Sequence, residues 1–358
     1  MFSLRLSLYW RSRVQFPHCL ATVQSDRQQL TLFTMYGWCI MQKKCFYPAI
    51  LFCLAVLVFY SSCKKSVANV ADAKLPAVTF TDDLGRTVSV QSVKKVAALQ
   101  LSLAHVWNCA GGSVSGASSD AVAELSGNTE NLGTMMNPNA ELIISGGYDF
   151  VIMSKNISAH KKLEPILAAA KIPCAYFYVE TFSDYMRVLK ICTDITGSEE
   201  SYTKNGTKIQ SLVESEIEKS RSAFASRPEK QKHPRVLVLR ASNGKVSARS
   251  SKNDMVSSML CELGCVNIAD SETSLLENLS LEKIAAENPE FVFVTTMGAS
   301  TQKAVDSIRD NILSNPVWAS LDAVKSGHFV MLPNDLFHYK PCERWAESYA
   351  YLNNVIHF

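Results

Sequence analysis

The sequence predicts an α/β protein of two α/β lobes, with mainly parallel sheets, joined by a single long linking helix. Three observations predict it: short β-rich runs alternate with helical stretches, one long amphipathic stretch interrupts them mid-chain, and one segment occurs twice. The chain has 358 residues, of which 47% are hydrophobic and 19% charged. It is therefore too apolar for a disordered protein and long enough for two domains.

The first lobe is expected at residues 78–197. Alternating strands and helices imply a parallel sheet covered by helices on both faces. The expected strands are Val96–Leu99, Phe150–Met153 and Cys174–Tyr178, and the expected helices are Leu103–Ala110, Pro138–Ser145, His160–Ala170 and Phe182–Thr196.

The linking helix is expected within residues 198–231. Glu199–Ser226 carries one apolar stripe among charged neighbours, which is typical of an amphipathic helix. Gly206 weakens this helix near its start, and Arg227-Pro228 ends it. The stripe consists of Ile209, Leu212, Val213, Ile217 and Phe224.

The second lobe is expected at residues 232–358, where the alternation restarts. Its predicted elements are the strands Val236–Leu239, Lys245–Ala248, Phe291–Thr295 and His328–Leu332, and the helices Asp254–Leu263, Leu281–Glu287, Gln302–Leu313 and Cys342–Ile356.

An internal repeat supports the two-lobe prediction. Pro138–Met153 matches Leu279–Val294, with Glu141 over Glu282. Each copy reads as a short helix beginning near a Glu, an acidic turn residue and a buried strand. Each lobe is therefore expected to present a Glu at an equivalent place.

The region before residue 63 is expected to be absent from the mature protein. Lys43 and Lys44 precede the apolar run Phe46–Tyr60 and the small residues that follow it, which is the pattern of a secretory signal peptide at residues 41–62. The run is short for a bilayer span. We expect residues 1–40 to be a mis-assigned N-terminal extension, with Met41 as the true start. An uncleaved anchor helix is the alternative.

Charge argues against a nucleic-acid partner. The chain has 36 basic and 33 acidic side chains, but six of the basic ones and only one acid lie before residue 63. The mature part therefore carries 30 basic against 32 acidic side chains, and no basic surface is suggested.

Tyr60-Ser-Ser-Cys63 resembles a bacterial lipobox, with Tyr60 where Leu is usual. The resemblance implies that Cys63 is lipidated and becomes the mature N-terminus, followed by a tether over residues 63–77. Six cysteines remain beyond it, and their spacing gives no zinc signature. They are expected to be buried thiols or to include one disulfide: Cys109, Cys174, Cys192, Cys261, Cys265 and Cys342.

Four ordered motifs resemble those of the class III substrate-binding proteins of ABC importers, which bind iron-siderophores, haem and cobalamin. The resemblance covers about residues 78–357, with Tyr148-Asp149 where Pro-Asp is usual. The motifs are Thr81–Val88 (TDDLGRTV), the two Glu-containing repeats, Asn315–Val330 (NPVWASLDAVKSGHFV) and Lys340–Trp345 (KPCERW).

The resemblance implies a binding protein without catalytic activity or cofactor. It implies a ligand cleft between the lobes, from which an iron complex is delivered to an ABC permease and its ATPase subunits. It also implies that Glu141 and Glu282 dock to the permease. The chain is expected to act as a monomer, exported and lipid-anchored to the bacterial membrane facing the periplasm or the cell exterior.

Loops at the carboxyl ends of the strands are expected to line the cleft. Lys155, Arg240, Arg249 and Lys252 are expected to neutralise an anionic ligand. Aromatic side chains of Tyr178, Phe337 and Tyr339 are expected to stack on it. Candidate iron ligands for haem are His105, His160, His338 and Tyr339. The expected ligand-binding residues are Ser102, His105, Met136, Lys155, Asn156, Tyr178, Arg240, Arg249, Met297, His338 and Tyr339.

The alternatives left open are a corrinoid as cargo, a chelatase-like enzyme and a surface lipoprotein that binds a host macromolecule. Neither a phosphate-binding loop nor a His-Glu-x-x-His motif is present in the sequence. The sequence also lacks the His-rich loop of the binding proteins for bare zinc or manganese. A metal chelate is therefore favoured over a bare metal ion.

Overall fold

The computed structural model describes residues 77–91, 93–125, 127–298 and 301–357, which belong to one compact unit, Ala71–Phe358. The expected extension, the signal peptide, Cys63 and all but the last residue of the tether lie outside the described residues. Within the described part, no helix combines the length and the apolar composition needed to cross a bilayer.

The first lobe is built on a five-stranded parallel sheet, as predicted, with strand order β5-β4-β3-β8-β9. These strands are β3 (Val96–Ala98), β4 (Val114–Ala117), β5 (Glu130–Asn131), β8 (Phe150–Ser154) and β9 (Cys174–Phe177). Two small hairpins accompany it, β1 (Val78–Thr81) with β2 (Thr87–Val90) and β6 (Gly133–Thr134) with β7 (Asn137–Pro138). The helices are α3 (Leu101–Cys109), α4 (Ser119–Glu124), α5 (Ala140–Ser145), α6 (Ser158–Ala169) and α7 (Phe182–Thr196).

Side-chain alternation along the strands divides the core of this lobe between the two faces of the sheet. Val151 and Met153 pack with the side chains of α5 and α6. Phe150 and Ile152, one position away, pack with those of α3 and α7. Helices therefore cover both faces, which explains why the strands read as continuous apolar runs.

Strand β4 was not predicted, and its sequence explains why. Val-Ser-Gly-Ala has a single strand-favouring residue, Val114, and the small side chains that follow it do not indicate a strand. A Cβ on Gly116 would lie 2.1 Å from the hydroxyl oxygen of Tyr148. Tyr148, which lies outside this strand, therefore requires glycine at position 116.

The second lobe is built on another five-stranded sheet, ordered β11-β10-β13-β14, with β12 paired to β10. Strand β11 is antiparallel and the others are parallel. The strands are β10 (Arg235–Ser242), β11 (Lys245–Arg249), β12 (Val266–Asn267), β13 (Phe291–Thr296) and β14 (Phe329–Met331). The helices are α10 (Met255–Glu262), α11 (Ile268–Ser271), α12 (Ser274–Glu277), α13 (Leu281–Glu287), α14 (Thr301–Ile308, continued by a π-helix at Arg309–Leu313), α15 (Pro316–Ser320), α16 (Asp322–Lys325), α17 (Asn334–Phe337) and α18 (Trp345–Ile356), which a 3-10 turn at Cys342–Arg344 precedes.

The linking helix departs from the prediction of one regular helix over Glu199–Ser226. It consists of α8 (Glu199–Tyr202), a π-helical turn (Thr203–Thr207) and α9 (Lys208–Ala225), and a 3-10 turn follows at Glu229–Gln231. The π-turn places Asn205 against the first lobe. Its side chain donates to the carbonyl oxygen of Cys109 (2.7 Å), and its own carbonyl accepts from the hydroxyl of Tyr185 (2.8 Å). The prediction that Leu212 belongs to the apolar stripe facing the core is wrong, because its side chain is exposed.

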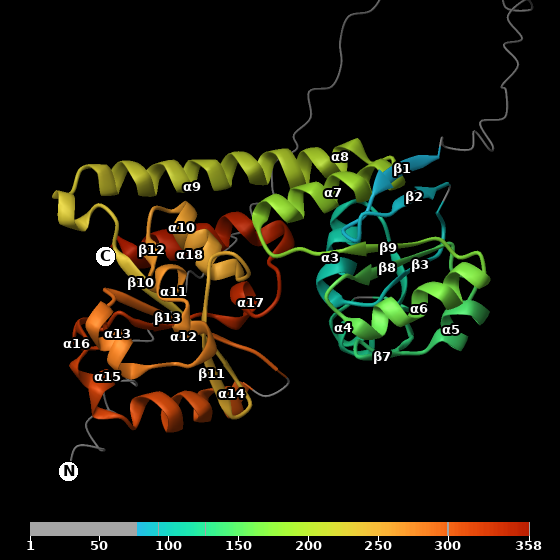
Figure 1. The fold of residues 1–358 in the computed structure, drawn as a ribbon. Coiled ribbons are helices and arrows are strands. Elements are labelled where there is room, and N and C mark those ends of the chain that lie inside the picture. The colour runs from blue at the N-terminus through green and yellow to red at the C-terminus, as the bar shows by residue number, and fades with distance from the viewer. Residues whose placement is uncertain (1–76, 92, 126, 299–300, 358) are drawn as a thin grey trace, which may run out of the picture. The chain divides into compact units, whose positions relative to one another are not determined.

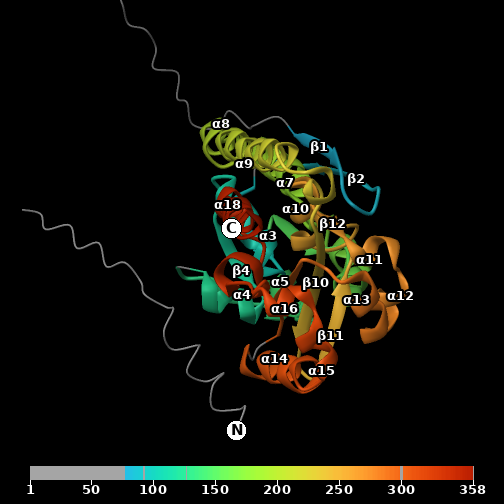
Figure 2. The same cartoon turned by 90° about the vertical axis from the view of Figure 1, so that its left-hand side faces the viewer.

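One hydrophobic cluster joins the two lobes beneath the linking helix. It includes residues of α3 and α7 from the first lobe, of α10 and α18 from the second, and of α9. Helix α18 lies alongside α9 (Figures 1 and 2), where the side chain of Asn353 donates to the Glu216 carboxylate over 2.9 Å. The lobes therefore share a core as well as a connection.

The two copies of the repeat start in the same way. The side chain of Asn139 accepts a hydrogen bond from the backbone N–H of Glu141 (3.0 Å) at the start of α5. Ser280 accepts from the N–H of Lys283 (3.4 Å) at the start of α13. Glu141 and Glu282 both lie in the first helical turn, and both are exposed.

The acidic turn residue makes the same pair of hydrogen bonds in both copies of the repeat. Asp149 accepts from the backbone N–H of Lys95 (2.8 Å) and donates its own N–H to the carbonyl of Lys95 (2.8 Å). Glu290 makes the same pair of bonds with Arg235, at 3.1 and 2.8 Å. The repeat is thus a structural unit that clips its own strand to the first strand of its sheet.

Candidate functional site

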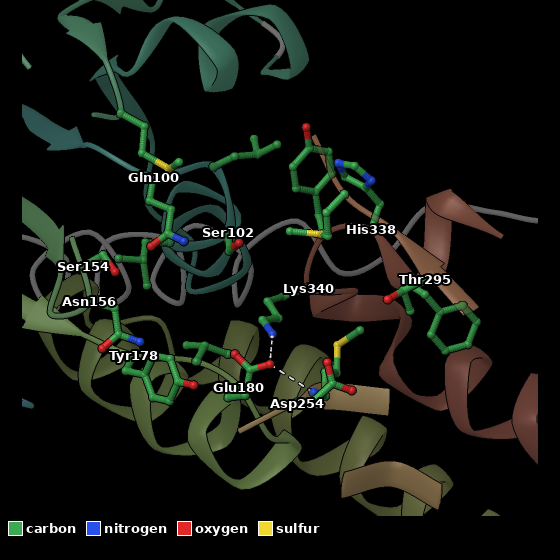
Figure 3. Close-up of a pocket in the computed structure, with 18 of the residues that line it drawn as sticks. Gln100, Ser102, Ser154, Asn156, Tyr178, Glu180, Asp254, Thr295, His338 and Lys340 are labelled. Carbon is green, nitrogen blue, oxygen red and sulfur yellow. Dashed lines mark hydrogen bonds and ion pairs between the residues drawn. The ribbon is translucent and has the colours of Figure 1, made fainter. Parts of the chain in front are cut away.

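Loops of both lobes line a cavity of about 300 Å³. Its walls are formed at the carboxyl ends of β3, β8 and β9, by α10 and the ends of β10 and β13, and by the loop after α17 (Figure 3). Because parallel strands end at the same edge of a sheet, these segments meet there. The lining residues are Gln100, Leu101, Ser102, Leu103, Asp120, Met135, Ser154, Asn156, Ile157, Tyr178, Val179, Glu180, Arg240, Asp254, Met255, Val256, Thr295, Met297, Phe337, His338, Tyr339 and Lys340.

An acid from the same wall neutralises the cavity's arginine. Asp254 is 1% exposed, and its Oδ2 lies 2.6 Å from Nη2 of Arg240 and 3.6 Å from Nε of Arg249. Its Oδ1 accepts from the N–H and hydroxyl of Ser257, both at 3.0 Å, which caps α10. A charged pair with this much burial stays together, because separating it would leave an uncompensated charge.

A second acid, Glu180, neutralises the cavity's lysine. Its Oε1 lies 2.8 Å from Nζ of Lys340 and accepts the backbone N–H of Met255 over 3.0 Å at the start of α10 (Figure 3). Glu180 belongs to the first lobe, whereas Lys340 and Met255 belong to the second. It therefore holds the two walls together across the floor of the cavity.

The first family-like motif, TDDLGRTV, positions this wall. Asp83 accepts the backbone N–H of Tyr178 over 2.6 Å. Asp82 accepts the N–H of Tyr176 over 3.1 Å and pairs with Arg86 at 2.7 Å. Burial alone would raise the pKa of Asp82, but the bonds from Arg86 and Tyr176 hold it below the usual value. The motif thus clips the β1–β2 hairpin to the end of β9.

Tyr178 presents a neutral hydroxyl to the cavity. Burial, followed by the nearby negative charge of Glu180, raises the pKa of Tyr178 to about 12. The Lys155 ammonium lies 5.1 Å from the centre of the Tyr178 ring. Lys155 therefore acts on the face of this ring, and it is not among the lining residues.

His160 is a positioning residue, and its prediction as an iron ligand is wrong. It is fully buried, and its Nδ1 accepts the backbone N–H of Ser154 over 3.0 Å. Its Nε2 must then carry the hydrogen, which it donates to the carbonyl of Met135 over 3.0 Å. Neither nitrogen is available to a metal, but both bonds fix cavity-lining residues.

We expect His160 to make the protein sensitive to mild acid. Burial lowers its pKa from 6.5 to about 4, so the unfolded chain binds the proton more readily. The stabilisation is complete above pH 6.5 and is lost as the pH falls toward about 4. Lowering the pH from about 7 to about 5 should reduce the unfolding free energy of the wild type by about 2 kcal/mol more than that of His160→Gln. Urea unfolding at both pH values measures this difference, with the exposed His233→Gln as control. Parallel losses in wild type and His160→Gln would contradict it.

The comparisons with known proteins agree with this geometry. The family model of the periplasmic binding proteins matches residues 92–336, more than half of the chain. The chain belongs to this family. The predicted resemblance to class III substrate-binding proteins of siderophore and haem importers is thereby confirmed. The family is extracytoplasmic, and its members are transport substrate-binding proteins that work with a permease and an ATPase.

Two curated proteins of Bacillus subtilis (strain 168) are similar to this chain. The "Iron-uptake system-binding protein" is 26% identical over 267 residues, which cover 74% of this chain and 78% of the relative. The "Fe(3+)-citrate-binding protein YfmC" is 25% identical over 290 residues, covering 76% and 85%. Among solved structures, Staphylococcus aureus SirA complexed with staphyloferrin B has a TM-score of 0.59 at 18% identity, covering 77% and 96%. The last likeness shows the fold.

The structure brings together seven of the residues predicted to bind ligand and places four outside the lining. His105 lines a second cavity beside Cys109 and the π-turn. Met136 is 64% exposed, and its neighbour Met135 lines the cavity instead. Arg249 lies behind Asp254, and Lys155 lies over Tyr178. The seven that line the cavity are Ser102, Asn156, Tyr178, Arg240, Met297, His338 and Tyr339.

The sequence prediction missed the acids that control the cavity. Glu180 follows the expected strand Cys174–Tyr178 and so lies in a loop expected to line the cleft, but it is not among the expected ligand-binding residues. The sequence predicts Asp254 only as the start of a helix and Lys340 only as part of a family motif. The available sequence signal for Asp254 is an acid at the start of a helix that follows two strands containing Arg240 and Arg249. Among the described residues, no group of three or more His, Cys, Asp or Glu side chains is arranged to hold a metal ion.

Proposed function

We propose that this chain captures an iron chelate in the cavity between the lobes and delivers it to the permease of an ABC importer. The family, the printed names of the curated relatives and the position of the cavity support this function. The chain acts as a binding protein and not as an enzyme. It acts as a monomer, exported and tethered by a lipid on Cys63.

The charges of the lining residues support a more specific proposal about the cargo. The described lining holds three carboxylates, Asp120, Glu180 and Asp254, and two cations, Arg240 and Lys340. Both cations are already paired with acids, Arg240 with the buried Asp254 at 2.6 Å and Lys340 with the half-buried Glu180 at 2.8 Å. An anionic chelate would bring negative charge next to these carboxylates, and drawing either cation away from its acid is costly where the pair is shielded from water. We therefore expect a chelate with a neutral or positively charged periphery.

The other lining residues suit such a ligand. Three methionines and the aliphatic side chains around them provide a polarisable apolar surface. Phe337, Tyr178 and Tyr339 add aromatic faces. Ser102 and Asn156 provide neutral hydrogen-bonding groups for carbonyl or amide oxygens of a chelator.

Fluorescence titration of the purified protein tests both parts of the proposal, the capture of an iron chelate and the charge of that chelate. The panel is ferrichrome (neutral), ferrioxamine B (cationic), ferric citrate and haemin (anionic), and cobalamin. We expect saturable binding to a neutral or cationic ferric chelate, at least about tenfold tighter than to ferric citrate, which corresponds to about 1.4 kcal/mol. The buried Trp107 and Trp345 are the reporters.

The outcomes distinguish a failure of the charge argument from a failure of the iron-transport function. Tight binding of ferric citrate or haemin would overturn the charge argument but keep iron transport. Cobalamin as the sole ligand would replace the cargo with a corrinoid. No binding across the panel, with steady metallation of a porphyrin by ferrous iron, would replace transport with a chelatase activity.

The permease contact is part of the same proposal. Glu141 and Glu282 lie at equivalent positions of the repeat, each exposed in the first turn of a helix. Neither makes a salt bridge in the described structure. Two matched carboxylates, one on each lobe, suit basic side chains on the permease.

A further inference from the structure

Two cysteines far apart in sequence lie against each other beside the cavity. Cys109 is the last residue of α3, and Cys342 begins the 3-10 turn before α18. The Sγ of Cys109 lies 3.3 Å from Oε2 of Glu343, the neighbour of Cys342. The Sγ of Cys342 lies 3.9 Å from the carbonyl oxygen of Ser102 in α3. Each sulfur therefore contacts the segment that carries the other.

The thiols also interact directly. The hydrogen bond with the Cys109 side chain, followed by burial, raises the pKa of Cys342 well above its usual value. All six described cysteines are free in the structure. Cys109 and Cys342 lie on segments that belong to different lobes.

The backbone at Cys342 is a second, independent observation. Its φ is +48°, in the left-handed region that a residue with a side chain rarely adopts. The side chain is 1% exposed and directed to α3. Strained backbone of this kind persists only where the surrounding structure enforces it, and it clusters at functional sites. Glycine would adopt this turn freely, so the cysteine side chain itself has a use here.

We propose that Cys109 and Cys342 form a disulfide in the exported protein. The family is extracytoplasmic, and disulfides form and persist in oxidising compartments outside the cytoplasm. The two thiols together lose two protons and two electrons. The acceptor is the disulfide of a thiol–disulfide oxidoreductase, which becomes a dithiol.

The exposure of the two sulfurs sets the order of the steps. Cys109 is half-buried and Cys342 is buried. The thiolate of Cys109 attacks the disulfide of the oxidant, forms a mixed disulfide and releases one thiolate. The thiolate of Cys342 then attacks the Cys109 sulfur, and the second thiol of the oxidant leaves.

The bond joins two walls of the cavity. Leu101, Ser102 and Leu103 at the start of α3 line it, and so do His338, Tyr339 and Lys340 just before Cys342. A covalent link between α3 and the turn at Cys342 fixes the loop that carries His338 and Tyr339. It does so whichever cargo is bound, so this inference does not depend on the identity of the chelate.

Peptide mapping tests the pairing. The purified protein is incubated with oxidised glutathione under native conditions, then alkylated in denaturant and digested without reduction. We expect a peptide containing Cys109 linked to one containing Cys342, and alkylated Cys174, Cys192, Cys261 and Cys265. Alkylated Cys109 and Cys342, or a link between Cys261 and Cys265 instead, would overturn the proposal.

Thermal unfolding tests the consequence. Oxidation should raise the midpoint by about 5–10 °C, because the link closes a very long loop in the unfolded chain. The rise should disappear in Cys109→Ser and remain in Cys174→Ser, whose cysteine is also half-buried. An unchanged midpoint in a protein whose link has been mapped would overturn the proposed stabilisation of the cavity wall.

Discussion

Replacing Asp254 with asparagine is expected to weaken the fold and to admit anionic chelates to the cavity. The amide keeps an oxygen that can cap α10 but removes the charge that pairs with Arg240 and Arg249. Both arginines are about three-quarters buried, with 28% and 26% of their side chains exposed. Leaving them unpaired should cost about 2–3 kcal/mol of unfolding free energy.

The same substitution should change the ligand preference in a defined direction. The freed guanidinium of Arg240 can donate to a carboxylate of the ligand, which should raise the affinity for ferric citrate about tenfold or more. Affinity for a neutral ferric chelate should change little. Fluorescence titration with both chelates and urea unfolding measure the two effects.

Asp194→Asn is the matched control for Asp254→Asn. Asp194 pairs with Lys190 on α7, where 45% and 52% of the two side chains are exposed. Exposed pairs of this kind contribute less than about 1 kcal/mol, and this one lies away from the cavity. An Asp254→Asn protein that discriminates against ferric citrate as strongly as the wild type would refute the role given to this acid.

The double substitution Glu141→Ala with Glu282→Ala should abolish stimulation of the importer's ATPase while leaving cargo affinity unchanged. The two carboxylates are exposed on α5 and α13 and are not among the residues that line the cavity. Each substitution alone should weaken stimulation about tenfold, since a charge-assisted bond contributes about 1.5–3 kcal/mol. ATP hydrolysis by the permease complex in vesicles, measured against protein concentration, gives the result.

A second pair of glutamates supplies the control for docking. Glu214 and Glu218 are also exposed, but both lie on α9. Glu214→Ala with Glu218→Ala removes the same charge and should leave stimulation intact. Loss of cargo binding in the Glu141/Glu282 double variant would assign these residues to the cavity, contrary to the proposal.

Periodicity predicted the core of the fold because the physics there is local. The runs at Phe150 and Phe291 are buried on both faces, so each reads as an unbroken apolar strand. Helix α7 was predicted with its observed bounds, because a Thr181–Asp184 capping box starts it and Gly197 ends it in the left-handed conformation. These signals lie within the segment itself.

The errors arose where a distant residue decides the outcome. Glycine is required at position 116 because the Tyr148 side chain lies where a Cβ would be. The π-turn places Asn205 in hydrogen bonds with Cys109 and Tyr185, which are distant in sequence. Arg240 was predicted as a free cation because its partner, Asp254, is on another element. Sequence reasoning could therefore place the cavity-lining loops, but it could not assign the charge state of the lining.

The hydrophobic cluster that α9 shares with both lobes bears on the kinetics of capture. A protein whose halves are packed together meets its cargo with the receiving surface nearly complete. Little free energy is then spent on reorganising the protein, and the encounter does not wait for a rare open state. Association rates should consequently be similar for different chelates, and the protein discriminates among them through how long each one stays bound.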